Sequence, residues 1–164
     1  MRRAAVQLGM DANPSIDMPA TFDVPVMEER RLASVGLAEN HKDYFITRNG
    51  ARYAGTHLIV DLWGAERLDD LDYIEETLRQ CVCASRATLL HIHLHHFTPN
   101  CGVSGVAVLA ESHISVHTWP ENGFAAFDVF MCGHAEPHKA IEVLQNAFKP
   151  ERITVGEHLR GRME

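Results

Sequence analysis

The chain has 164 residues, with 15 lysines and arginines against 22 aspartates and glutamates, which gives a net charge of -7 at pH 7. This balance argues against nucleic acid or anionic membrane as the main partner, because both require a basic surface. No apolar run approaches the roughly 18 residues that cross a bilayer, and residues 1–10 lack the apolar stretch of an export signal. We therefore expect one cytoplasmic domain.

Residues 1–50 differ in composition from the rest of the chain. They contain three prolines, few aromatic residues and a charged run at 28–31. Such a segment buries little apolar area by itself. We expect a mobile or loosely docked arm, in which Val26–Leu37 could form a short helix, followed by the catalytic domain over residues 51–164.

From residue 51 onward, extended and helical patterns alternate. A β-branched and apolar stretch predicts a strand over Thr56–Trp63, and apolar residues at helical spacing predict a helix over Leu68–Ala84. Pro137–Phe148 is typical of a second helix, and Arg152–Glu157 of a last strand. Between the helices, alternating segments bounded by turn residues predict strands over 89–97, 102–110, 112–119 and 124–131.

These four strands are expected to be antiparallel neighbours, because their connections are too short for parallel crossovers. The order of one strand, one helix and then paired strands favours an α+β fold, with helices covering one face of an antiparallel sheet.

The segment 89–97 carries a cluster of histidines. Alternation places His91, His93 and His95 on one face of the strand, together with Phe97. A three-histidine zinc site is one interpretation, but three such residues span roughly 13 Å along a single strand, too far for ligands of one ion. We therefore expect a polar sheet face and no metal. Alternation also predicts that the opposite face, toward the helices, holds Leu90, Ile92 and Leu94.

The cysteines give weak signals. Cys81 and Cys83 lie two apart in a helical pattern and do not face each other, so we expect them to pack rather than to bind metal or form a disulfide. Cys101 falls in a loop. Cys132 ends a strand, where a lone thiol is more often a buried apolar group than a reactive one.

The densest chemistry surrounds Glu111 and Ser112. The run AESHISVHTWPE at 110–121, followed by FDVFMCG at 127–133, combines hydroxyl, imidazole, carboxyl and thiol groups within about thirty residues. It resembles the prokaryotic S-adenosylmethionine decarboxylase family, whose members make a pyruvoyl cofactor by self-cleavage. The resemblance covers roughly Gly55 to Arg162.

The resemblance implies that Ser112 becomes the pyruvoyl group. The Ser112 hydroxyl would attack the Glu111 carbonyl to form an ester; elimination would break the chain, and hydrolysis of the dehydroalanine would leave the pyruvoyl group, which forms a Schiff base with the substrate. Ser104 and His117 match the processing positions, with His117 as proton acceptor. Cys132 matches the proton donor in catalysis.

The resemblance also implies a substrate and an assembly. S-adenosylmethionine would lose carbon dioxide to give the aminopropyl donor of spermidine synthesis. Phe97 would stack on the adenine and Glu121 would bind the ribose, and Trp63 is a further stacking candidate. In the family, two protomers pack sheet to sheet as an αββα sandwich with sites at the interface, so a homodimer is expected.

Residue parity adds a constraint on this dimer. Ser112 and His117 are five positions apart, so one regular strand points them to opposite faces. We therefore hypothesise that His117 and Ser104 act on Ser112 of the partner subunit.

Two alternatives stay open. The same pyruvoyl chemistry could act on an amino acid such as arginine or ornithine, because the motif does not define the substrate pocket. The chain could instead be a non-catalytic metal-binding dimer built around the histidine strand.

Overall fold

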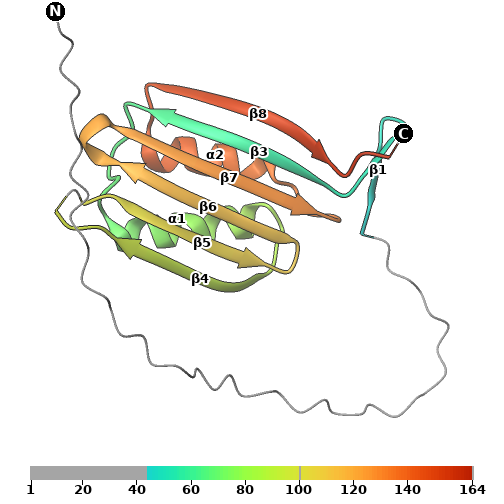
Figure 1. Ribbon diagram of the computed structural model, residues 1–164, viewed down its shortest axis with the longest axis horizontal. Helices are drawn as coiled ribbons and strands as arrows, with labels where there is room; N and C mark the ends of the chain where they lie inside the picture. The colour runs from blue at the N-terminus through green and yellow to red at the C-terminus, as the bar shows by residue number, and fades with distance from the viewer. Residues whose placement is uncertain (1–43, 100, 164) are drawn as a thin grey trace, which may run out of the picture. The chain divides into compact units, whose positions relative to one another are not determined.

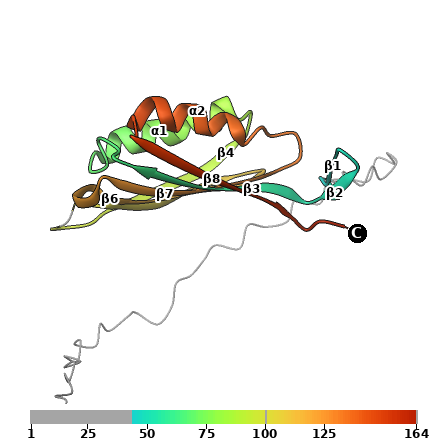
Figure 2. The same cartoon turned by 90° about the horizontal axis from the view of Figure 1, so that it is seen from above.

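The computed structural model describes residues 44–99 and 101–163, which contain a six-stranded antiparallel sheet with two helices on one face (Figures 1 and 2). The strands lie in the order β4-β5-β6-β7-β3-β8. Their bounds are Gly55–Trp63 (β3), Leu89–His96 (β4), Val103–Leu109 (β5), Ser112–Trp119 (β6), Phe124–Cys132 (β7) and Arg152–Arg160 (β8). The expected α+β class and the antiparallel succession from β4 to β7 are confirmed.

The two helices are α1 (Leu71–Ala84) and α2 (His138–Phe148). Helix α1 starts three residues later than the periodicity suggested, because the Asp70 carboxylate accepts a hydrogen bond from the Tyr73 N–H at 3.0 Å and caps the helix. Leu68 is nevertheless buried. The core lies between the helices and the sheet, and its largest fully buried side chains include Phe127, Phe148, Leu58, Leu62, Ile74 and Ile114.

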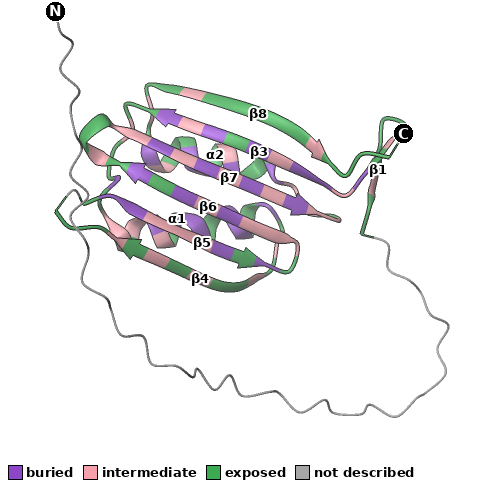
Figure 3. Cartoon of the chain, in the orientation of Figure 1, coloured by how far each residue is buried: buried purple, intermediate pink, exposed green. Residues whose placement is uncertain are grey.

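Burial alternates along the central strands and weakens at the edge strands β4 and β8 (Figure 3). On β4, Ile92 and Leu94 pack against the core, while His91, His93 and His95 are exposed, as expected. The expectation for Leu90 was wrong, since its side chain is 63% exposed. The pairing with β5 shifts between Leu89 and His91, and this bulge interrupts the alternation.

A short hairpin precedes the sheet and was not expected from the sequence. Strands β1 (Ile46–Arg48) and β2 (Ala51–Tyr53) pair around Asn49 and Gly50, which have φ values of 51° and 76°. Those left-handed conformations suit a two-residue hairpin turn. The hairpin lies across the expected arm boundary at residue 50, and the expected helix Val26–Leu37 falls outside the described residues. Within the described part of the chain, no helix is long and apolar enough to cross a membrane.

Candidate active site

Glu111 and Ser112 lie in a tight turn at one end of the sheet. Strands β5 and β6 are joined by only Ala110 and Glu111, and Leu109 pairs directly with Ser112. Ser112 has a φ of 137°, a conformation that side-chain-bearing residues rarely adopt and that costs about 1–3 kcal/mol. Strain of this kind, located at a candidate cleavage point, is consistent with a functional role.

Hydrogen bonds hold the Glu111–Ser112 peptide on two sides. The backbone N–H of Cys132 donates to the Glu111 carbonyl oxygen at 3.0 Å. The Glu111 carboxylate accepts from the Thr88 N–H at 2.8 Å and from the Thr88 hydroxyl at 3.3 Å. The carbonyl carbon that the Ser112 hydroxyl would attack is therefore fixed, and its oxygen already has a donor.

The four cysteines differ in their surroundings. Cys81 is fully buried, and burial raises the pKa of its thiol to about 12, which suppresses its reactivity. Cys83 is exposed, so the expectation that it packs was wrong: it lies on the outer face of α1, two positions from Cys81. Cys101 is exposed, and Cys132 is half-buried at the end of β7. Cys132 is the cysteine that contacts the Glu111–Ser112 turn.

Ser104 and His117 form a second polar pair, on neighbouring strands. They are direct partners in the β5–β6 ladder, and the Ser104 hydroxyl lies 2.7 Å from His117 Nδ1. His117 is exposed on the sheet face that the helices leave uncovered, because its neighbours Val116 and Thr118 are buried on the helix side. The resemblance gave both residues processing roles, and the structure shows in addition that they contact each other.

A cavity of about 350 Å³ opens beside this pair. Phe97, Ser104 and Glu121 line it, so two of the three expected substrate residues share one space. Trp63 does not line it; its ring lies 4.4 Å from that of Phe124 and 5.0 Å from the Arg152 guanidinium carbon. Sequence reasoning missed Trp119, which lines the cavity and is 40% exposed. Its place two residues after His117, on the same strand face, was the available signal.

Ser112 and the Ser104–His117 pair lie far apart within one chain. Ser112 begins β6, and His117 is the sixth residue of that strand. Five steps at about 3.3 Å per residue separate them by roughly 16 Å. One chain therefore holds the Glu111–Ser112 peptide and Cys132 at one end of the sheet, and the Ser104–His117 pair with its cavity toward the other.

Across residues 44–99 and 101–163, no three histidine, cysteine, aspartate or glutamate side chains are arranged to hold a metal ion. His91, His93 and His95 stay spread along β4, as the strand spacing requires.

Fold and site together define a two-layer α+β protein with a strained serine at a strand start, and comparison with known proteins gives its family. Residues 56–161 match the family model described as S-adenosylmethionine decarboxylase. The chain belongs to the S-adenosylmethionine decarboxylase family.

Individual relatives agree with the family match. A protein of Thermomicrobium roseum named S-adenosylmethionine decarboxylase proenzyme is 49% identical over 108 residues, which are 65% of this chain and 93% of that protein. A protein of Methanococcus maripaludis with the same name is 52% identical over 113 residues, 67% of this chain and 92% of its own length. The crystal structure of the adenosylmethionine decarboxylase from Aquifex aeolicus superimposes with a TM-score of 0.62 at 37% identity, covering 68% of this chain and 94% of that one.

Proposed function

We propose that this protein is a pyruvoyl-dependent decarboxylase that converts S-adenosylmethionine to its aminopropyl-donating product and carbon dioxide, for spermidine synthesis. It becomes active by cleaving itself between Glu111 and Ser112. The observation that carries the proposal is the geometry of this peptide: Ser112 has a φ of 137°, and the Glu111 carbonyl accepts the Cys132 N–H at 3.0 Å.

Self-cleavage uses groups that surround the turn. The Ser112 hydroxyl attacks the Glu111 carbonyl carbon, and negative charge develops on the oxygen that the Cys132 N–H already contacts. A donor directed at a developing oxyanion stabilises the transition state. The Glu111 carboxylate, bound to Thr88, fixes the acyl side of the peptide while the bond to the Ser112 nitrogen breaks. Removal of the Ser112 α-proton requires a base, and we assign that role to His117 held by Ser104.

The residues at the start of β6 fit a pyruvoyl group, because Ser112 supplies its carbon atoms and the turn leaves it at a strand end, next to the residue whose carbonyl accepts the Cys132 N–H. The group supplies a carbonyl that takes the substrate amine and accepts the electrons released with carbon dioxide. Cys132 then donates a proton to the substrate α-carbon. Phe97 and Trp119 offer flat faces for an adenine, and Glu121 offers a carboxylate for ribose hydroxyls.

Two copies of the chain are needed to bring these groups together. The uncovered sheet face carries exposed large apolar side chains, among them Ile59, Trp63, Val108 and Trp119, alongside histidines. An apolar patch within a polar rim is typical of a protein interface. We propose that two protomers pack through this face as an αββα sandwich, so that His117 and the cavity of one protomer serve Ser112 of the other. The active protein is then a cytoplasmic homodimer with shared sites.

Mass spectrometry and substrate assays test the proposal. The purified protein should give two fragments that meet at Ser112, the smaller without a free amine, and should release carbon dioxide from S-adenosylmethionine. Ser112→Ala should stay intact. Ser115→Ala is the matched control: this β6 serine donates to Asp128 at 2.9 Å, away from the turn, and its variant should still be cut.

Three outcomes would contradict this function. Carbon dioxide released from arginine or ornithine, and none from S-adenosylmethionine, would assign the same chemistry to an amino acid. An intact chain that takes up stoichiometric zinc would indicate the metal-binding dimer. An intact chain that takes up no zinc would show that the proposed self-cleavage does not occur.

A further inference from the structure

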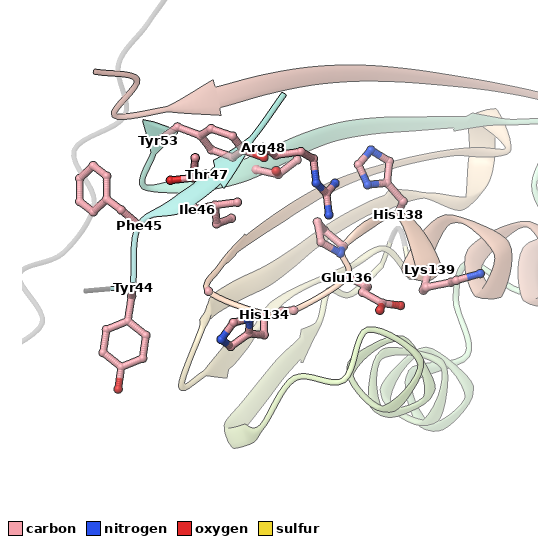
Figure 4. Close-up of a pocket in the computed structure, with 14 residues that line it drawn as sticks. Tyr44, Phe45, Ile46, Thr47, Arg48, Tyr53, His134, Glu136, His138 and Lys139 are labelled. Carbon is pink, nitrogen blue, oxygen red and sulfur yellow. The ribbon is translucent and has the colours of Figure 1, made fainter. Parts of the chain in front are cut away.

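A second cavity lies outside the proposed active site, between the β1–β2 hairpin and the connection from β7 to α2. Its volume is about 750 Å³, a size that holds a drug-sized molecule. Figure 4 shows Arg48 and Ile46 entering this space from the hairpin, and His134, Glu136 and His138 bordering it from the connection. The hairpin lies outside residues 56–161, so this wall is not part of the matched family region.

The charges around this cavity are mainly basic, although the whole chain is acidic. Among the described lining residues, Arg48 and Lys139 are the cations and Glu136 is the acid, with the imidazoles of His134 and His138 beside them. The Glu136 carboxylate lies 3.4 Å from the Arg86 guanidinium, in an exposed pair that water also screens. His138 and Lys139 contact Glu157 and Glu142 at 3.2 and 3.3 Å, but these are exposed pairs that water screens. The described lining therefore carries two cations, Arg48 and Lys139, against one carboxylate.

Apart from Thr47 and Thr56, the rest of the described lining is aromatic or apolar, and Tyr44 and Phe45 are 63% and 40% exposed. Tyr53 is 2% exposed, Pro137 is buried, and Ile46 and Ala135 are half-buried. Helix α2 begins at His138 and no side chain caps its start, so the positive end of its dipole adds to the basic side. The cavity thus has an apolar body and a cationic rim.

We propose that this cavity binds a small organic anion, with an aromatic or aliphatic body against Tyr44 and Ile46 and a carboxylate, sulfonate or phosphate near Arg48 and Lys139. Guanidinium and ammonium groups are the usual partners of such anions. A Cβ atom on Gly133 would lie 3.7 Å from Tyr44 Cδ1, so the segment that leads into the hairpin borders the turn that directly follows Cys132. An occupant would contact that turn.

A matched pair of fluorescent probes tests the charge requirement. 8-Anilinonaphthalene-1-sulfonate has the apolar body and an anionic group, and N-phenyl-1-naphthylamine has the same body without the sulfonate. In the full-length protein, Arg48→Gln with Lys139→Gln should weaken sulfonate binding by about tenfold, because two charge-assisted contacts are lost. The neutral probe should change by less than about twofold, since the apolar contact is kept.

The control variant is Arg79→Gln with Lys149→Gln, which removes the same charge from exposed positions away from the cavity. It should leave sulfonate binding unchanged. Equal weakening in both variants would mean that net charge alone attracts the probe, and would overturn the proposal.

A second measurement locates the probe in the unmodified protein and does not depend on the variants folding. In amide ¹H–¹⁵N spectra, titration with the sulfonate should shift Gly133, His134 and Lys139 together with the hairpin. Shifts confined to the uncovered sheet face, around Trp63 and Trp119, would refute the site.

Discussion

The distance between Ser112 and His117 within one chain predicts that His117 acts on Ser112 of the partner subunit. A general base must approach within hydrogen-bond reach of the proton that it removes, about 3 Å, whereas roughly 16 Å of strand separates the two residues in one chain. Loss of such a base slows its step by about 10²–10⁴-fold. We therefore expect chains carrying His117→Ala, alone, to remain uncut on the time scale in which the unmodified protein is cleaved.

Co-expression of two differently tagged variants tests whether His117 of one chain acts on Ser112 of the other. In mixed dimers, a Ser112→Ala chain supplies an intact His117 to the Ser112 of a His117→Ala chain. With random pairing of equal amounts, about half of the His117→Ala chains lie in mixed dimers and should be cleaved, while the Ser112→Ala chains stay intact. Intact-mass analysis of each tagged chain gives both fractions.

A matched mixture provides the control. When the helper chain carries both Ser112→Ala and His117→Ala, no cleavage is expected, because no imidazole is then available at either position. Cleavage of the His117→Ala chain by itself at the normal rate, or none in the mixed dimers, would refute the assignment of His117 across the interface.

Three further experiments test individual residues. Cys132→Ala keeps the backbone N–H that contacts Glu111, so self-cleavage should proceed. Carbon dioxide release should fall by about 10²–10⁴-fold, because the proton donor is lost. Uncut Cys132→Ala chains would contradict this division of roles. Glu111→Leu removes the contacts to Thr88 and should slow cleavage by about tenfold, because the peptide is no longer held in position. Glu111→Gln keeps an acceptor for Thr88 and should be cut within a few-fold of the normal rate. Pulse-chase gels measure both rates, and equal rates for the two variants would exclude the positioning role. Cys83 should react with a thiol reagent in the native protein. Cys81 should react only after unfolding, because burial raises the pKa of its thiol to about 12. Peptide mapping of the labelled protein measures both, and modification of Cys81 before Cys83 would contradict this prediction.

The local patterns of the sequence predicted most of the elements, and the structure shows where local information ends. Alternation and turn residues located β4 to β7, and short connections fixed their antiparallel order. The insertion of β3 between β7 and β8 was not predictable in this way. Its pairs, such as Gly55 with Cys132 and with Arg160, join residues far apart in the chain, and periodicity carries no information about such partners.

The site shows the same division. The motif identified Ser104 and His117 before their contact was visible, but the Thr88–Glu111 bonds had no sequence signal, because they depend on where β4 begins relative to the β5–β6 turn. Leu90 was assigned to the wrong face because a bulge is a property of strand pairing and not of the strand itself.

The strand order has a consequence for the cut protein. The proposed cleavage after Glu111 would leave β3, β4 and β5 in one piece and β6, β7 and β8 in the other, and β3 lies between β7 and β8. The two pieces are interleaved, with α1 on one and α2 on the other. Once unfolded, they can rebuild the sheet only by a bimolecular encounter, whereas the uncut chain refolds with all six strands tethered. Maturation is therefore a one-way step that has to follow folding, since the sheet that keeps the pieces together must exist before the bond is broken.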